Sequence, residues 1–347
     1  MKKVDYIIVG SGLAGILFCE VLKQHNKSFV VYDNSSQHSS TVAGGLYNPV
    51  ILKRFTRVWK AKEQLDLALP IYHELEHNLN IKLDYKIPIY RLFASVEEQN
   101  NWFEASDKPS LSHFLSSKIL NPTITSIKCN FGYGKVLETG RIDTTTLIKC
   151  YREDLNKNNQ FKKETFVYNE LSLNSSYVTY HNYKAKYIVF AEGFGVVKNS
   201  FYNYLPLKPT KGELLTIYAP DLKIDFVLKS SVFLIPLGNH LYLVGATYEW
   251  DDTSPNITDK AKSELLNKLD KFINCDYKVV NQVAGIRPTV KDRRPLVGQH
   301  PKHHNMFVLN GLGTRGVMIG PYVAKQLFAY IEEEQPLEKE IDIRRFI

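Results

Sequence analysis

The sequence predicts an α/β protein, α+β overall, in which a discontinuous Rossmann-like domain is joined to a smaller domain built on an antiparallel sheet. Three observations support this prediction. A strand–glycine turn–helix–strand unit starts at the first residues, a second strand–turn–helix unit lies near the C-terminus, and closely spaced strand candidates fill the region before it. The predicted bounds are 1–80, 132–204 and 284–347 for the first domain, and 81–131 and 205–283 for the second.

The N-terminal unit reads "DYIIVGSGLAGILFCEVL" from Asp5 to Leu22. Val4 to Val9 is short and rich in β-branched residues, which is typical of a buried parallel strand. A helix is predicted from Ile16 to about Gln24, and "KSFVVYD" is predicted to be a second buried strand that ends at Asp33. This order of elements indicates a dinucleotide-binding unit.

Each residue of the motif has a physical role in such a unit. Gly10 permits the tight turn, Gly12 lets the backbone approach a pyrophosphate, and Gly15 lets the helix pack closely on the strand. The helix N-terminus presents free N–H groups and a partial positive charge to the phosphates. Asp33 can accept hydrogen bonds from both hydroxyls of an adenosine ribose, and it would repel a 2′-phosphate, which argues against NADP.

Two further segments favour FAD over NAD. Tyr187 to Ala191 is predicted to be a strand that ends in a glycine-containing turn. Met306 to Leu309 is predicted to be a strand, followed by a turn over 311–316 and a helix over 317–331. NAD does not need this late unit, whereas the extended FAD molecule could reach it. The N–H groups of that helix could then stabilise negative charge on a reduced flavin.

Further elements are expected along the chain. The region 51–79 is mostly helical in pattern, with a break or restart at Pro70. An N-cap at Asp143 or Thr144 starts another helix. The remaining predictions are strands at 87–94, 212–219, 225–230, 231–237 and 240–250, and helices at 96–106 and 259–272.

The composition of the chain narrows the classes of protein to which it can belong. The chain has 347 residues, 44% of them apolar, and no run of them is long and apolar enough to span a bilayer, so we expect a cytoplasmic protein without a membrane partner. Its four cysteines form no CxxC pair, which predicts neither disulfides nor a metal site. The net charge of +8 either attracts anionic substrates or nucleic acid, or simply keeps the surface soluble. The same two interpretations apply to Arg54 and Arg57.

The glycine motif and Asp33, together with "SSTVAGGLYNPV", "VFAEGFG", "AGIRPTVKDRRPLVG" and "NGLGTRGVMIGP", resemble the D-amino-acid-oxidase superfamily of FAD enzymes, in its glycine oxidase and sarcosine oxidase branch. The resemblance implies an FAD-dependent amine or amino-acid oxidase or dehydrogenase, which oxidises a C–N bond by hydride transfer to flavin N5. The electron acceptor would be O2 or another carrier. Some relatives attach flavin to a cysteine near the C-terminal motif, and residues 285–347 contain none, so non-covalent FAD is expected.

The resemblance also implies which residues contact the cofactor. They lie in the glycine turn, after the second strand, along the Ser-rich loop, in a strand expected at about 165–168, and in the two later turns. The implied contacts are Gly10, Gly12, Leu13, Ala14, Gly15, Asp33, Asn34, Ser40, Thr41, Gly44, Gly45, Phe166, Ala191, Glu192, Gly193, Gly313, Thr314, Arg315, Gly316 and Val317.

On the substrate side, the resemblance assigns Arg287 to the substrate carboxylate, which a planar guanidinium can hold through two parallel hydrogen bonds. An ion pair between Arg287 and Asp292 or another acid is the structural alternative. Phe233 stands where glycine oxidases carry a tyrosine, which argues against glycine itself as substrate. Tyr248 or Tyr47 could supply a hydroxyl instead, or be packed. Arg315 either approaches the flavin or substrate, or lies in an exposed turn.

Three functions therefore remain open. The first is oxidation of a small amine, an amino acid or an N-substituted glycine. The second is a tRNA-modifying role, because the same motifs resemble the FAD domain of the bifunctional enzyme that removes a carboxymethyl group from a modified wobble uridine. That substrate is itself an N-substituted glycine, so Arg287 would serve in both. The third is a non-catalytic flavin-binding protein.

Overall fold

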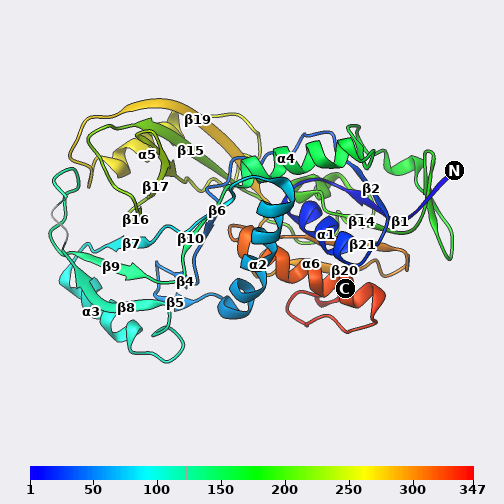
Figure 1. Ribbon diagram of the computed structural model, residues 1–347, viewed down its shortest axis with the longest axis horizontal. Coiled ribbons are helices and arrows are strands. Elements are labelled where there is room, and N and C mark those ends of the chain that lie inside the picture. The colour runs from blue at the N-terminus through cyan, green and yellow to red at the C-terminus, as the bar shows by residue number, and fades with distance from the viewer. Residues whose placement is uncertain (122–123) are drawn as a thin grey trace.

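Two large sheets lie side by side along the length of the molecule in the computed structural model, which describes residues 1–121 and 124–347 (Figure 1). Helices α1, α4 and α6 lie against the first sheet, α2 packs on α6 near the middle of the molecule, and α3 and α5 lie against the second sheet. The mixed α/β architecture agrees with the predicted fold class. Within the described residues, no helix has both the length and the apolar character needed to cross a membrane.

The first sheet is parallel at its centre. β1 (Lys2–Val9) lies between β2 (Phe29–Tyr32) and β14 (Tyr183–Phe190), and β21 (Met306–Asn310) continues the parallel order beyond β14. The carboxyl-terminal halves of β1 and β14, and the whole of β2 and β21, are almost wholly buried and apolar, as their sequences predict. Because their carboxyl ends are in register, the turns that follow them meet at one edge. The outer strands are β11 (Phe161–Lys162), β12 (Ser172–Leu173), β13 (Val178–Tyr180) and β20 (Leu296–Gln299).

The helices of this half occupy the predicted positions. α1 (Leu13–Gln24) packs against α6 (Gly316–Glu332), where Gly320 allows close approach because a Cβ there would lie 2.6 Å from Leu17 Cδ1. α2 (Ala61–Leu79) contacts α6, and α4 (Thr144–Lys157) contacts α1. The predicted cap of α4 is confirmed, since Asp143 accepts a hydrogen bond from the Thr146 N–H at 3.2 Å.

The second sheet has the order β19-β15-β18-β17-β16-β7-β9-β8. Its antiparallel centre confirms the four strands predicted between 205 and 250: β15 (Thr210–Tyr218), β16 (Val227–Lys229), β17 (Phe233–Gly238) and β18 (Leu241–Gly245). β19 (Lys278–Arg287) forms one edge, and β16 pairs in parallel with β7 (Ile89–Leu92), which leads to β9 (Tyr133–Val136) and β8 (Leu115–Leu120). α5 (Asp259–Leu269) packs on β15 and β18, and α3 (Val96–Ser106) packs on β8.

The remaining elements are short. A small sheet is formed by β3 (Leu46–Tyr47), β10 (Gly140–Ile142) and β6 (Asp84–Tyr85). A hairpin is formed by β4 (Val50–Ile51) and β5 (Thr56–Arg57). Short 3-10 helices cover Tyr168–Glu170, Gly193–Lys198 and Ile343–Phe346. Since β9 and β19 belong to the second sheet, that sheet extends past residues 131 and 283. The domain bounds stay a prediction.

Three local predictions were wrong. Pro70 does not interrupt α2, because it lies with Asp66 on the solvent-exposed face, where water can replace the hydrogen bond that proline cannot donate. Residues 51–60 are not helical, since Phe55 and Lys60 have positive φ angles of 46° and 47°. No strand forms at 165–168, where the Val167 N–H donates to the Tyr180 hydroxyl at 2.9 Å.

Candidate active site

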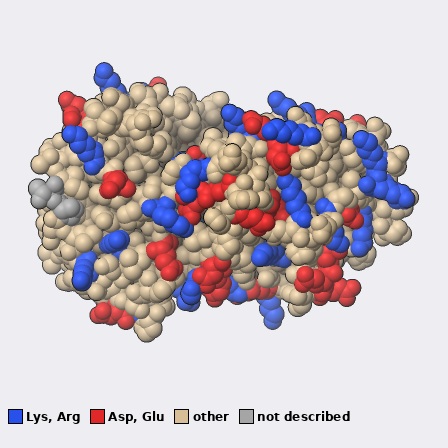
Figure 2. Space-filling view, in the orientation of Figure 1, with Lys and Arg blue, Asp and Glu red and all other residues tan. Residues whose placement is uncertain are grey.

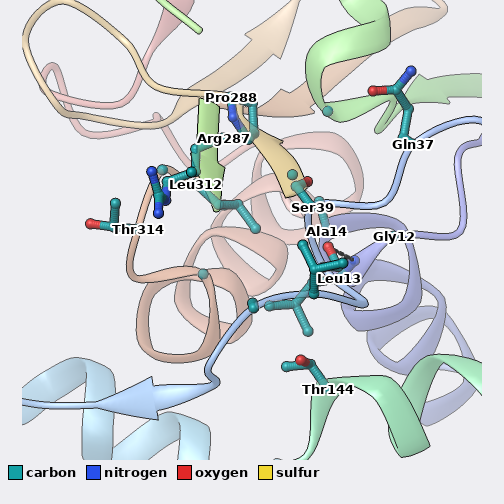
Figure 3. Close-up of a pocket in the computed structure, with 18 of the residues that line it drawn as sticks. Gly12, Leu13, Ala14, Gln37, Ser39, Thr144, Arg287, Pro288, Leu312 and Thr314 are labelled. Atoms are coloured by element: carbon teal, nitrogen blue, oxygen red, sulfur yellow. Dashed lines mark hydrogen bonds between the residues drawn. The ribbon is translucent and has the colours of Figure 1, made fainter. Parts of the chain in front are cut away.

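A cavity of about 660 Å³ opens at the carboxyl ends of β1, β14 and β21 and extends under the second sheet. This is the edge at which α/β sheets bind ligands, and the volume is in the range of cofactor and substrate sites. Figure 3 shows Gly12, Leu13 and Ala14 on one side of this cavity and Arg287, Leu312 and Thr314 on the other.

The cavity brings together residues that are far apart in the sequence. All the cofactor contacts implied above line it except Gly15 and Thr41, and so do Arg287, Phe233 and Tyr248 of the substrate side. Gly15 lies behind the first turn, and the Thr41 hydroxyl donates to the His38 carbonyl at 2.9 Å. Tyr47 is packed outside the lining, since it is buried and its hydroxyl donates to Asp84 at 2.8 Å.

The first glycine turn is fixed by steric contacts. Gly10 has a φ of +106°, and a Cβ on it would lie 2.4 Å from the Ala191 carbonyl oxygen. A Cβ on Gly15 would lie 1.9 Å from the Gly10 carbonyl oxygen. Neither position can therefore hold a side chain without moving the backbone. The result is that the N-terminus of α1 faces the cavity at close range, where its N–H groups can meet an anion.

Asp33 organises the loops around this turn. Its carboxylate accepts hydrogen bonds from the backbone N–H groups of Ser11 and Ser35, both at 2.5 Å. Arg152 of α4 lies 3.5 Å from the same carboxylate and donates from Nε to the Ser11 hydroxyl at 2.7 Å. Arg152 could not be predicted as part of this site, because in the sequence it resembles any charged residue of an amphipathic helix.

Asn310 joins the two later turns. It is 1% exposed, its Nδ2 donates to the Gly193 carbonyl at 2.8 Å, and its Oδ1 accepts from the Gly311 N–H at 2.7 Å. The turn after β14 is thereby tied to the turn after β21. This contact positions Arg315, Gly316 and the start of α6 at the cavity wall.

Glu192 is a half-buried acid in the wall. Burial raises the pKa of Glu192 to about 7, although the hydrogen bonds that it accepts from the Tyr168 hydroxyl at 2.6 Å and Asn199 Nδ2 at 2.7 Å act to lower it. A neutral carboxyl group is easier than a charged one to keep beside a negatively charged ligand.

Arg287, at the end of β19, lies in the substrate half of the cavity. Its guanidinium crosses Gly212 of β15 so closely that a Cβ on Gly212 would lie 2.0 Å from Nη2. The group also lies over the Tyr248 ring, 4.7 Å from the centroid, and Nη1 donates to the Thr247 carbonyl at 3.3 Å. An isolated glycine within a strand candidate is a signal of close approach, so Gly212 could have been found from the sequence.

The alternative ion pair between Arg287 and Asp292 does not form. Asp292 instead pairs with Arg345 at 2.8 Å. Among residues 1–121 and 124–347, no carboxylate lies within ion-pair distance of Arg287 or Arg315. Burial lowers the pKa of both arginines from their usual value, and both remain cations at neutral pH.

The acids of the lining lie on one side, whereas its cations come from both sides, since Lys198 and Arg315 belong to loops of the first sheet. In the described chain, the lining acids are Asp33, Glu164 and Glu192, and all come from loops of the first sheet. The second sheet contributes Lys229 and Arg287 and no acid. Lys229 and the apolar residues Leu214 and Ile235 also line the cavity, although no local pattern in the sequence predicts them there.

The family model for DAO, the FAD dependent oxidoreductases, matches residues 5–330. The chain belongs to this family.

Individual proteins show the same relationship. A glycine oxidase of Geobacillus kaustophilus is 26% identical over 140 residues, which is 38% of this chain and 36% of that protein. The tRNA 5-methylaminomethyl-2-thiouridine biosynthesis bifunctional protein MnmC of Aromatoleum aromaticum is 27% identical over 176 residues, which is 44% of this chain and 28% of that protein. The matched region thus spans roughly a third of each of these relatives.

Solved structures share the fold over the whole chain. The crystal structure of glycine oxidase from Geobacillus kaustophilus aligns with a TM-score of 0.83 at 18% identity, covering 100% of this chain and 98% of that one. The crystal structure of iminodiacetate oxidase from Chelativorans sp. BNC1 aligns with a TM-score of 0.78 at 16% identity, covering 98% of each chain.

The residues of the cavity fit FAD. Gly10 and Gly15 leave room that a side chain would fill, the N-termini of α1 and α6 both open into the cavity, and Asp33 is placed to accept from a ribose. These residues would hold the two ends of the extended cofactor.

The first prediction concerns Asp33. Replacing Asp33 by Ala should weaken FAD binding about 10- to 100-fold, since charged hydrogen bonds to the ribose and to the Ser11 N–H are lost together. Flavin absorbance of the purified protein after extended dialysis measures the retained FAD. Asp5→Ala, which alters a carboxylate near the middle of β1 that does not line the cavity, is the matched control. Full occupancy of Asp33→Ala after dialysis would remove Asp33 from the cofactor site.

The second prediction concerns Glu192. Because its folded pKa of about 7 lies above its unfolded value, Glu192 favours folding most at low pH, and this contribution is lost as pH rises from about 4.5 through 7. Gln can replace it, accepting from Asn199 and donating to the Tyr168 hydroxyl. Glu192→Gln should therefore raise the melting temperature, relative to the parent protein, more at pH 8 than at pH 5. An equal shift at both pH values would contradict the raised pKa.

Proposed function

We propose that this protein oxidises the C–N bond of an amino acid or N-substituted glycine, with FAD as its cofactor. The single observation that supports this most strongly is Arg287, a half-buried guanidinium at the substrate end of the cavity that has no carboxylate partner in the described residues. A substrate carboxylate would supply the missing partner.

The chain's own residues would orient the substrate. Arg287 would anchor the carboxylate by paired hydrogen bonds, and Phe233 and Leu214 would give the substrate an apolar wall. Burial beside two arginines also disfavours a protonated amine, so the substrate nitrogen would be held neutral without a dedicated base. Bound FAD would accept the hydride, and O2 or another acceptor would then reoxidise it.

The relatives support this class of substrate. Their names include glycine oxidase, iminodiacetate oxidase and L-proline dehydrogenase, which all act on carboxylated amines and include both oxidases and dehydrogenases. Phe233 brings no hydroxyl to the wall, which favours a substrate with an apolar or larger group over glycine itself.

We also propose that FAD is held non-covalently. In the part of the chain that the structure describes, none of the four cysteines lines the cavity.

The third prediction tests the reaction and Arg287 together. Under anaerobic conditions, N-substituted glycines or amino acids should bleach the bound flavin of the parent protein. In Arg287→Ala the amine concentration needed should rise on the order of 100-fold while FAD stays bound, because two charged hydrogen bonds are lost. Arg287→Lys should recover only part of the loss, since the ammonium cannot form the fork.

Arg54→Ala is the matched control, since it removes an exposed cation from the β4–β5 hairpin. An unchanged amine dependence in Arg287→Ala would remove this residue from the site. If no amine in a broad panel bleaches the flavin of the parent protein, a non-catalytic flavin-binding role becomes the better explanation.

The alternative is a tRNA-modifying role, and one surface feature favours it. The β4–β5 hairpin carries Lys53, Arg54 and Arg57, all exposed, and Lys53 lines the cavity. On the face shown in Figure 2, basic and acidic residues are interspersed, and this distribution of charge does not indicate a nucleic-acid-binding surface.

The fourth prediction separates this alternative from the small-molecule reaction. A tRNA-modifying enzyme should bind tRNA in low salt, with an affinity that falls steeply as salt rises. Replacing Lys53, Arg54 and Arg57 by Gln should lower that affinity and reduce the salt slope. Fluorescence anisotropy with labelled tRNA measures both, and absence of binding in low salt would exclude the tRNA role.

A further inference from the structure

Lys229 of β16 is a half-buried lysine in the cavity wall to which the reaction above gives no role. Its ammonium lies 4.8 Å from the centroid of the Phe233 ring and donates to the Ser230 carbonyl at 2.8 Å. An ammonium has three N–H donors, so this leaves two of them for other acceptors. Burial lowers the pKa of Lys229 to about 8, so a large share is charged at neutral pH.

The carboxylates near Lys229 do not form an ion pair with its ammonium group. Arg91 of β7 is paired with Glu98 at 2.5 Å, and Lys268 of α5 is paired with Glu264 at 2.5 Å. Both carboxylates are thus already engaged by other cations. Among residues 1–121 and 124–347, Lys229 itself forms no ion pair.

Lys229 and Arg287 lie on the same face of the second sheet. Lys229 is directly opposite Phe233, Phe233 is opposite Gly245, and Gly245 is opposite Leu214. The Arg287 guanidinium crosses Gly212, two residues before Leu214 on the same strand. Side chains two residues apart on a strand, and directly opposite each other on paired strands, share a face. The two cations therefore face one cavity with apolar residues between them.

The spacing can be estimated from the sheet. Three strand spacings of about 4.8 Å and two residues of about 3.4 Å rise separate Gly212 from Lys229, which is roughly 16 Å in all, and the lysine side chain, which reaches toward Phe233, shortens the gap between the two cationic groups to roughly 11 Å. A molecule with one carboxylate would meet only one of them.

We propose that Lys229 forms a second anion subsite, and that the preferred substrate is an N-substituted glycine or amino acid with a second carboxylate beyond an apolar spacer. This inference rests on the proposed function, because it assigns the first carboxylate to Arg287. One ammonium matches one negative charge, and the Phe233, Ile235 and Leu214 wall matches the spacer.

The fifth prediction uses binding instead of turnover. The FAD-loaded protein is titrated at constant ionic strength with unbranched dicarboxylates of increasing length and with monocarboxylates of the same lengths, while the absorption spectrum of the bound flavin reports occupancy. The dicarboxylate of best length should bind about 10-fold more tightly than its monocarboxylate partner, because it makes one more charged hydrogen bond.

Lys229→Met should abolish this preference and leave monocarboxylate binding unchanged. Lys268→Met, which removes a cation that is already paired, should keep the preference. If Lys229→Met does not accumulate as folded FAD-loaded protein, Lys229→Gln replaces it in the same titration. Equal binding of both ligand series by the parent protein, or an undiminished preference in the Lys229 variant, would overturn the subsite.

Failure of this subsite differs from failure of the proposed reaction. A dicarboxylate preference that depends on Lys229, found in a protein whose flavin no amine bleaches, would keep the subsite and reject the reaction. Bleaching by monocarboxylated amines without any dicarboxylate preference would keep the reaction and reject the subsite.

Discussion

The close approach of α1 to the carboxyl end of β1 is the constraint on which the rest of the structure depends. Gly15 lies against the Gly10 carbonyl, and Gly10 lies against the Ala191 carbonyl of the neighbouring turn. Three segments therefore meet at backbone contact distance, and side chains are excluded from the point where they meet. The first helix presents its N-terminus to the cavity only because this contact is so short, and the cofactor half of the site follows from it.

The second sheet adds what the first cannot provide. Its strands place Arg287 over Gly212 and the Phe233 ring beside Lys229. Apolar residues lie between the two cations, and all of these side chains share one face of the sheet. The acids of the cavity wall come only from the first sheet in the described residues. The acids are thus confined to the half that is suited to ribose hydroxyls, and the half built by the second sheet, which is suited to carboxylates, contains cations without acids among the described residues.

Much of this arrangement could be predicted from the sequence, because its signals are local. The buried strands 4–9 and 306–309, the glycine turns and the cap at Asp143 each depend on neighbours within a few residues. Arg152, Lys229 and Asn310 were missed because their roles depend on partners far along the chain. Pro70 shows the opposite case, where a strong local signal was overridden by the position of the residue on an exposed helix face.

Asn310 has one more consequence. Its side chain links the turn at 193 to the turn at 311, and the first strand lies on the other side of β14. The binding cradle is thus assembled from three separate segments, β1, β14 and β21, so a nascent chain still lacking β21 cannot possess it. Cofactor loading is therefore expected to follow synthesis of β21, and bound FAD would then hold these three segments together and protect them from proteases.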